Sequence, residues 1–360
     1  MLKSETLTLA YKPDADEAQE RMRAFWAGEM IDRPCVSVLT PKKGVAAPYI
    51  THISAPDLRL DEGIARFDEW ASSVYFGGEL MPTFRPDFGP DQFAAFIGAH
   101  MEITEDGLTS WVEPFVEDWS ALKPFTIKPD NMWWRAVLEI TALAAEMGEG
   151  KFIIRTLDMH TNMDCLSAIR GAGRLCTDMI DYPDELLRAL KWVDGLFKPV
   201  FDAVFAAGRM EKRGTTTWAD MWSDGRTEVI QCDFCFMIGP DHFRKFVLPS
   251  LEYELSCLDT AVYHLDGPGE VRHLDDLLAM RDLDCIQWIP GTGQPPAPAW
   301  VDMLQKIQNA GKSIQVYVSA DELKTLHPQL MPNRVFYTVT GGCADEKEAE
   351  DLLIWLKRNS

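Results

Sequence analysis

The stretch from Ala261 to Gly269 reads AVYHLDGPG, and the rest of the chain is interpreted around it. Its apolar start is typical of a buried strand, and the glycines and proline at its end break that strand. Residues two apart in a strand point to the same side, so His264 and Asp266 are expected to project together from the strand end. Such a pair suits a ligand or metal site. The other interpretation is a histidine and an aspartate that only close a strand-to-helix loop.

Strand and helix patterns alternate along the second half of the chain. Six predicted strands, each followed by a helical pattern, lie at 151–157, 214–218, 260–264, 283–289, 313–318 and 335–339. This alternation predicts parallel βα units. Candidate strands at 35–39 and 74–77 bring the number to eight, which predicts an α/β fold of the (β/α)8 TIM-barrel type. A doubly wound sheet is the alternative, and the chain lacks the Gly-x-Gly-x-x-Gly turn and the phosphate loop that would favour it.

Two further segments complete the predicted architecture, a single domain over residues 1–360. A helix near 15–30 and an irregular stretch at 44–64 form an N-terminal extension. Residues 81–124 are rich in proline, glycine and aromatic side chains, which indicates a long packed excursion over one end of the fold. Long ordered excursions are often functional.

Composition narrows the classes of partner. The formal net charge of -21 argues against nucleic acids and anionic membranes, which bind basic surfaces. No apolar run approaches the ~20 residues of a membrane helix, and the N-terminus lacks the apolar core of a secretion signal. A cytoplasmic location, reduced cysteines and a small-molecule substrate are therefore expected.

Polar and aromatic residues recur where the predicted strands end, which is where TIM barrels carry their active sites. Asp158 and Asp220 are candidate acid–base groups, although aspartates at such positions can also be helix N-caps. The candidates for a substrate pocket are His160, Trp218, Trp222, Tyr263 and Trp288. These aromatic side chains would suit a flat or methyl-bearing molecule, and they are also common core fillers.

His264, Asp266 and Cys343 together offer three ligands for zinc. Catalytic zinc sites commonly use three protein ligands and keep a fourth position open. His160 and Cys232 are alternatives to any one of the three. A cysteine that packs under the last helix is the other interpretation of Cys343.

Four segments carry a resemblance to the uroporphyrinogen decarboxylase superfamily, which includes zinc- and corrinoid-dependent methyltransferases. They are RMRAFWAGEMIDRP at 21–34, DCLSAIRG at 164–171, MIGPDHFRKFVLP at 237–249 and YHLDG at 263–267. The resemblance covers most of the chain and implies a (β/α)8 barrel, often as a homodimer. The methyltransferase branch binds zinc through His-x-Cys and a later cysteine, which implies a role for His264 and Cys343.

The departures from this family bear on function. Residues 28–34 read GEMIDRP where uroporphyrinogen decarboxylases carry an arginine-rich Arg-Gln-Ala-Gly-Arg segment, which argues against heme-pathway decarboxylation. Asp266 replaces the middle cysteine of the methyltransferase zinc motif. A carboxylate also binds zinc, and the site would then be more Lewis-acidic.

Three functional hypotheses follow. The first is a zinc-assisted methyltransferase that acts on a small organic substrate and a corrinoid carried by a separate protein, since no Asp-x-His-x-x-Gly cobalamin motif occurs here. The second is a metal-independent decarboxylase or lyase that uses His264, Asp266, Asp158 and Asp220 as acid–base groups. The third is a ligand-binding protein without catalysis.

Overall fold

The computed structural model describes residues 4–42, 44–45, 60–104 and 110–360. The strands are β1 (Cys35–Pro41), β2 (Val74–Gly78), β3 (Thr83–Phe84), β4 (Met101–Ile103), β5 (Ser110–Val112), β6 (Ile153–Ile154), β7 (Thr215–Thr216), β8 (Trp222–Ser223), β9 (Thr227–Ile230), β10 (Thr260–Asp266), β11 (Cys285–Ile289), β12 (Ser313–Ser319) and β13 (Val335–Gly341).

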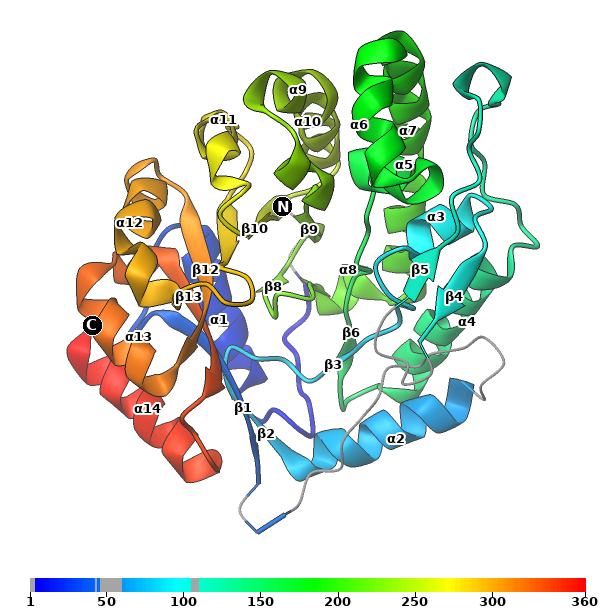
Figure 1. Ribbon diagram of the computed structural model, residues 1–360. Coiled ribbons are helices and arrows are strands. Elements are labelled where there is room, and N and C mark those ends of the chain that lie inside the picture. The colour runs from blue at the N-terminus through cyan, green and yellow to red at the C-terminus, as the bar shows by residue number, and fades with distance from the viewer. Residues whose placement is uncertain (1–3, 43, 46–59, 105–109) are drawn as a thin grey trace.

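The α-helices surround these strands (Figure 1). They are α1 (Ala15–Trp26), α2 (Leu60–Ser73), α3 (Gln92–Phe96), α4 (Met132–Met147), α5 (Asn162–Arg170), α6 (Ala172–Asp181), α7 (Pro183–Ala207), α8 (Met210–Arg213), α9 (Pro240–Phe246), α10 (Leu248–Ser256), α11 (Leu274–Ala279), α12 (Val301–Asn309), α13 (Ala320–Leu326) and α14 (Glu346–Asn359). The 3-10 helices are η1 (Trp119–Ala121), η2 (Asp233–Met237), η3 (Val271–His273), η4 (Ala297–Trp300), η5 (His327–Gln329) and η6 (Pro332–Arg334).

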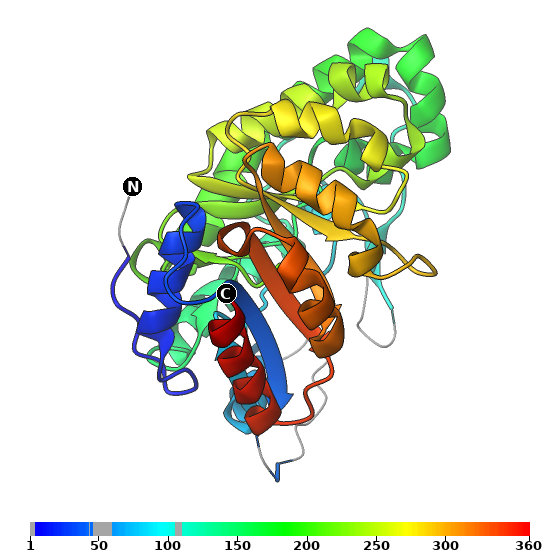
Figure 2. The same ribbon diagram turned by 90° about the vertical axis from the view of Figure 1, so that its left-hand side faces the viewer.

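Seven strands form the main sheet, in the order β2-β1-β13-β12-β11-β10-β9. Every neighbouring pair in it is parallel except β1 and β2. Helices α11 to α14 lie in a row along the outer side of these strands (Figure 2). Parallel strands with covering helices confirm the predicted βα units of an α/β fold.

The predicted closed eight-stranded barrel is confirmed only in part. Strands β3 and β6 form a separate parallel pair, and one bridge, Arg155 to Thr216, links the end of β6 to β7. Within the described residues, the hydrogen-bonded ladder does not run on from β9 to β1 through these short strands. The structure therefore shows a parallel sheet with many helices, and a closed barrel remains an expectation.

One strand prediction was wrong, and one strand was not predicted. The segment 74–77 is not a parallel barrel strand, because β2 returns directly beside β1 in the antiparallel direction. The parallel neighbour of β10 is β9, which the sequence pattern did not indicate. Its four residues include the charged Glu228, so neither its length nor its hydrophobicity marks it as a central strand.

The helix predictions were right in position, but the helix expected near 15–30 ends at Trp26 and two predicted helices are divided. The pattern at 163–180 is divided at Gly171, whose backbone φ of 89° lies outside the helical region. The pattern at 240–258 is divided at Val247, two residues before Pro249. The predicted capping box of Ser319 and Glu322 is confirmed at the start of α13.

The predicted excursion at 81–124 is well packed where it is described. It contains β3, α3, β4, β5 and η1, and Phe84, Phe93, Phe96 and Trp119 are all buried. Residues 105–109 and most of the predicted irregular stretch at 44–64 lie outside the described residues. In the described parts of the chain, no helix is both long and apolar enough to cross a bilayer.

Side chains on the inner side of the sheet form an apolar layer below a polar one. Cys35, Val262, Cys285 and Phe336 belong to one buried cluster that α1 also joins. Two residues further along their strands, the same side carries polar residues, namely Ser37, His264, Gln287 and Thr338. Strand register aligns His264 with Gln287 and Ser37 with Thr338. The interior therefore turns polar toward the carboxyl ends of the strands.

A buried ion pair holds the first strands together. Glu79 is 0% exposed and accepts two hydrogen bonds from the Arg33 guanidinium, at 2.7 and 2.8 Å, and one from the Val36 N–H at 2.8 Å. Arg33 is 6% exposed, so both charges depend on each other for compensation.

We expect Glu79→Gln to lower the free energy of unfolding by about 3–5 kcal/mol, because it leaves the Arg33 charge buried without its counter-ion. Chemical denaturation measures the change. The control is Asp275→Asn, which breaks an exposed pair with Lys306 and should change stability by less than about 0.5 kcal/mol. Equal effects of the two substitutions would show that the buried pair does not hold the strands.

Candidate active site

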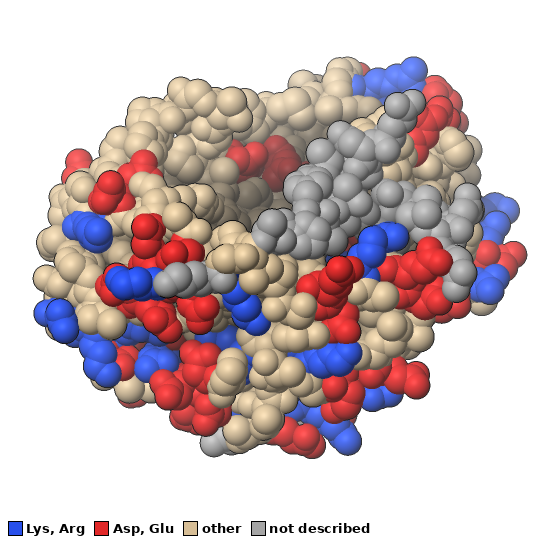
Figure 3. Space-filling model, turned by 90° about the horizontal axis from the view of Figure 1, so that it is seen from below, with Lys and Arg blue, Asp and Glu red and all other residues tan. Residues whose placement is uncertain are grey.

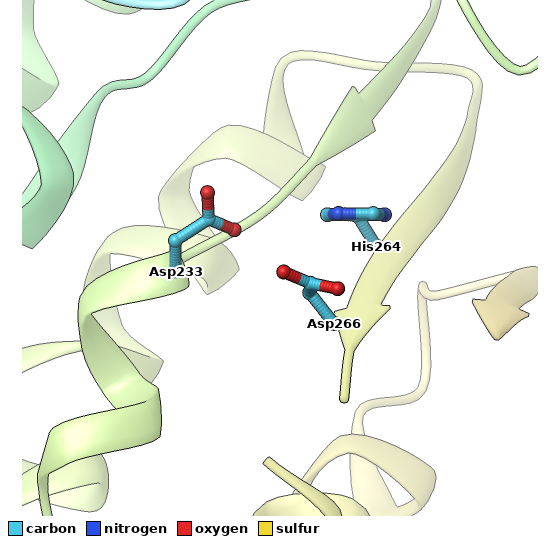
Figure 4. Close-up of side chains that lie close together, drawn as sticks. All are labelled: Asp233, His264 and Asp266. Carbon is cyan, nitrogen blue, oxygen red and sulfur yellow. The ribbon is translucent and has the colours of Figure 1, made fainter. Parts of the chain in front are cut away.

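Three potential metal ligands meet at the end of β10. One ligand atom each from Asp233, His264 and Asp266 lies within 4.8 Å of the other two. His264 and Asp266 extend from the same side of β10, and Asp233, at the start of η2, faces them from the neighbouring segment (Figure 4). His264 and Asp266 are half-buried and Asp233 is exposed. One imidazole and two carboxylates are a set that binds zinc and other divalent ions.

The face at which the parallel strands end is hollowed (Figure 3). Acidic side chains lie inside the hollow, and uncharged residues form much of its wall (Figure 3). A concave acidic site favours a bound cation over a bound anion.

Neighbouring residues orient the His264 ring. Its Nδ1 is hydrogen-bonded to Oε1 of Gln287, the residue in register on β11. Because an amide oxygen only accepts, Nδ1 carries the proton and Nε2 keeps a lone pair for a metal. The Trp218 ring packs edge-on against the imidazole, with centroids 5.0 Å apart.

Buried carboxyl groups position the two aspartates. The Asp266 N–H donates to Glu270 at 3.2 Å, and burial raises the pKa of Glu270 to about 11, so this carboxyl stays protonated near neutral pH. Asp164 accepts the N–H groups of Asp233 and Phe234, at 3.0 and 2.8 Å. Burial raises the pKa of Asp164 to about 7, and the nearby Asp233 charge adds to the effect.

His160 lies between two aspartates beside this group. Its Nε2 is 3.5 Å from Asp158 Oδ1, and its Nδ1 is 3.9 Å from Asp164 Oδ2. Burial lowers the pKa of His160, but the charges of Asp158 and Asp164 outweigh burial and raise that pKa overall. His160 and Asp158 therefore form an acid–base pair next to the potential metal ligands.

Three of the predicted substrate contacts lie in the core. Trp222, Tyr263 and Trp288 are each 0% exposed, so the predicted aromatic wall is not formed by them. The reason is strand alternation: Tyr263 and Trp288 are next to the inward-facing His264 and Gln287 and therefore point outward, toward the helices. Trp218 alone of the four lies beside His264.

Cys343 and Asp220 lie elsewhere on the same rim. Both line a cavity of about 400 Å³ at the ends of β1, β12 and β13. Among the described residues, Cys343 is not part of the group formed by Asp233, His264 and Asp266. It follows β13, which is three strands from β10 in the sheet, or roughly 14 Å at the usual strand spacing.

Sequence reasoning missed Asp233 and Gln287. Asp233 follows Cys232 and comes after a strand that the sequence pattern did not indicate. Gln287 could have been found from its position, because it occupies on β11 the place that His264 occupies on β10.

A second buried carboxyl supports the turn that carries His160 and Asp164. Glu254 on α10 is 1% exposed and accepts hydrogen bonds from Thr161 Oγ1 and from Asn162 Nδ2, the latter at 3.2 Å. Asn162 has a left-handed backbone, with φ of 46°, so these bonds hold an unfavourable conformation. Burial raises the pKa of Glu254 to about 8.

Comparison with known proteins supports the fold. A solved structure described as a methyltransferase from Methanosarcina mazei superposes with a TM-score of 0.63 and 15% sequence identity, covering 95% of this chain and 98% of that one. A B12-independent methionine synthase from Shewanella sp. W3-18-1 matches less well, with a TM-score of 0.46 and 10% identity over 91% of this chain and 98% of that chain. No protein-family model matches the sequence, and no curated protein does. At these identities the first likeness shows a shared fold.

We expect the free energy of unfolding to fall as pH rises from 5 to 9, partly because Glu254 must ionise in a site that favours its protonated form. Its pKa is raised on folding, so its contribution is complete below about pH 4.5 and is lost as pH rises through about 8. Glu254→Gln, which cannot ionise, should reduce this fall by on the order of 4 kcal/mol. Denaturation at several pH values measures the difference.

The matched control is Glu252→Gln, an exposed residue on the same helix, which should leave the pH dependence of unfolding unchanged. If Glu254→Gln behaves like this control, Glu254 is already ionised in the folded protein.

Proposed function

We propose that this protein is a zinc-dependent methyltransferase that moves a methyl group between a small organic substrate and a corrinoid on a separate protein. The observation that carries the proposal is the convergence of Asp233, His264 and Asp266 at the carboxyl end of β10. The family resemblance and the fold shared with a methyltransferase structure support it.

The residues present fit a catalytic zinc ion. Three protein ligands leave a fourth position for substrate, and the Gln287 hydrogen bond leaves the free lone pair of His264 on Nε2. Such a metal, when bound, holds a substrate thiol or hydroxyl and lowers its pKa. Two carboxylates in place of two thiolates make the set harder, so manganese or iron is a second choice after zinc.

Side chains of the protein would remove the proton from the methyl acceptor. In a methyl transfer the methyl leaves its donor without the bonding electrons, and the acceptor heteroatom supplies the pair for the new bond. An acceptor thiol or hydroxyl must therefore lose its proton, and the pair of His160 and Asp158 lies beside the ligands to take it. In the reverse direction the same pair returns a proton to the released heteroatom.

We expect the purified protein to bind about one zinc ion per chain after metal loading, measured by elemental analysis and by titration. His264→Ala, Asp266→Asn and Asp233→Asn should each weaken zinc binding by at least about 100-fold, since each removes one of three ligands. Absence of stoichiometric metal in the loaded protein would reject the site.

Cys343→Ser is the matched control, because Cys343 lies on the same rim and outside the ligand group. This variant should keep zinc affinity within about threefold of the unaltered protein. A loss as large as that of His264→Ala would restore Cys343 to the ligand set expected from the family resemblance.

We expect Gln287→Leu to keep the three ligands and still weaken zinc binding by about 10–100-fold, because the ring orientation and tautomer of His264 are no longer held. Gln315→Leu, on the next strand in register, is the control and should leave zinc affinity nearly unchanged. Equal losses in both variants would point to a general change in the interior.

Methyl transfer itself is tested with free methylcobalamin and 2-mercaptoethanol. The zinc-loaded protein should accelerate the loss of methylcobalamin absorbance, and a chelator should abolish that acceleration. A chelator-resistant release of CO2 from a carboxylated substrate would instead favour the metal-independent decarboxylase.

A further inference from the structure

A cavity opens on the same rim as the proposed metal ligands, but at other strands of the sheet. It has a volume of about 400 Å³ and lies at the carboxyl ends of β1, β12 and β13. Its volume is within the range of small-molecule sites. Its lining residues are Ser37, Val38, Leu39, Leu80, Asp220, Tyr317, Thr338, Val339, Thr340, Gly341 and Cys343. The cavity thus has an apolar wall and a polar end.

The polar end consists of one carboxyl and three hydroxyl groups. Ser37 Oγ donates to Thr338 Oγ1 at 3.3 Å, and Thr338 Oγ1 also accepts from Gln315 Nε2 at 2.6 Å. Asp220 and the Tyr317 hydroxyl complete this end. With a carboxylate and hydroxyl oxygens, it offers more acceptors than donors.

The backbone of Asp220, at the polar end of the cavity, has an unfavourable conformation. Its φ of 62° lies in the left-handed region, where non-glycine residues are uncommon, and its N–H closes a turn on the Thr217 carbonyl at 3.1 Å. Such conformations are energetically unfavourable and concentrate at functional sites. The β7–β8 turn therefore presents the Asp220 carboxyl to the cavity at an energetic cost.

Two buried amides beside the cavity each have one atom without a hydrogen-bond partner. Among the described residues, no group forms a hydrogen bond with Nε2 of Gln287 or with Oε1 of Gln315, and both side chains are 0% exposed. The Tyr317 hydroxyl lies close enough to the Gln287 amide to interact with it. An unpaired buried polar group is destabilising, and a bound molecule or its water shell would supply the missing partner.

We propose that this cavity binds a small organic molecule with a short aliphatic body and a head group that donates hydrogen bonds, such as a primary alcohol or a primary ammonium. The body would lie against Leu39, Leu80 and Val339, and the head would donate to Asp220. If the proposed function is correct, this molecule is the second substrate. Its binding to the cavity does not depend on that function.

The charges around Asp220 explain the choice of head group. The Arg155 charge acts on Asp220, but its Nη2 already donates to Asp87 at 2.6 Å, and the Ser37 hydroxyl occupies only part of the acceptor capacity of the Asp220 carboxyl. Asp220 therefore keeps acceptor capacity for a ligand, and a carboxylate ligand would meet a like charge. Burial raises the pKa of Asp220 to about 6, so it is ionised at pH 8.

The test uses Cys343 as a reporter in metal-free protein. Its alkylation by iodoacetamide at pH 8 is followed by peptide mass spectrometry, with 1-butanol, butylammonium or butyrate present. Cys257, partly exposed and outside the cavity, is the internal control. We expect butanol and butylammonium to slow alkylation of Cys343 at least fivefold, and butyrate to have no effect. The rate at Cys257 should be unchanged.

Two variants test the head-group contact. Asp220→Asn suits the left-handed backbone and should weaken protection by butylammonium at least tenfold, while butanol changes less than threefold. Tyr317→Phe should weaken protection by butanol. Lack of protection by both ligands, equal protection at Cys257, or protection by butyrate as strong as by butylammonium would overturn the proposal. Because the protein is metal-free, each of these results is independent of the zinc site.

Discussion

The two-residue period of a parallel strand is the constraint on which this site depends. On β10 it places His264 and Asp266 on the inner side and Tyr263 and Leu265 among the helices outside. Because neighbouring parallel strands share this period in register, the same layer of β11 contributes Gln287. A shift of β10 by one residue would bury the imidazole under the helices and turn the Tyr263 ring inward. The apolar layer below, closed by α1, resists such a shift.

Buried carboxyl groups around the polar layer hold its residues in place, although burying these groups is energetically unfavourable. Asp164 holds the start of η2, Glu270 holds the end of β10, and Glu254 holds the turn before α5. Each carboxyl is removed from solvent and has a raised pKa, so each binds a proton more firmly in the folded protein than in the unfolded chain. Such arrangements lower stability and fix geometry, which is typical of functional sites.

The sequence predicted the elements that have a strong hydrophobic period and did not predict those in which this period is absent. It found β10 to β13 and the pair of His264 and Asp266, because long apolar runs and a strand end are local signals. It missed β9 and hence Asp233, since a short strand that contains Glu228 has no such signal. It assigned Trp222 and Trp288 to a pocket because residue type does not reveal which side of a strand faces outward. The place of Cys343 depends on strand order around the sheet, which only the structure gives.

The three proposed ligands belong to two segments of different character. Two extend from one strand of the sheet, and the third begins a five-residue 3-10 turn between β9 and α9. A cation bound by all three residues would connect these two segments. Binding of the cation and ordering of the turn would then be linked equilibria, so that each favours the other. The strand would supply two of the ligands, and the turn would supply the third. Release of the ion would then begin with detachment of Asp233 rather than with loss of the imidazole.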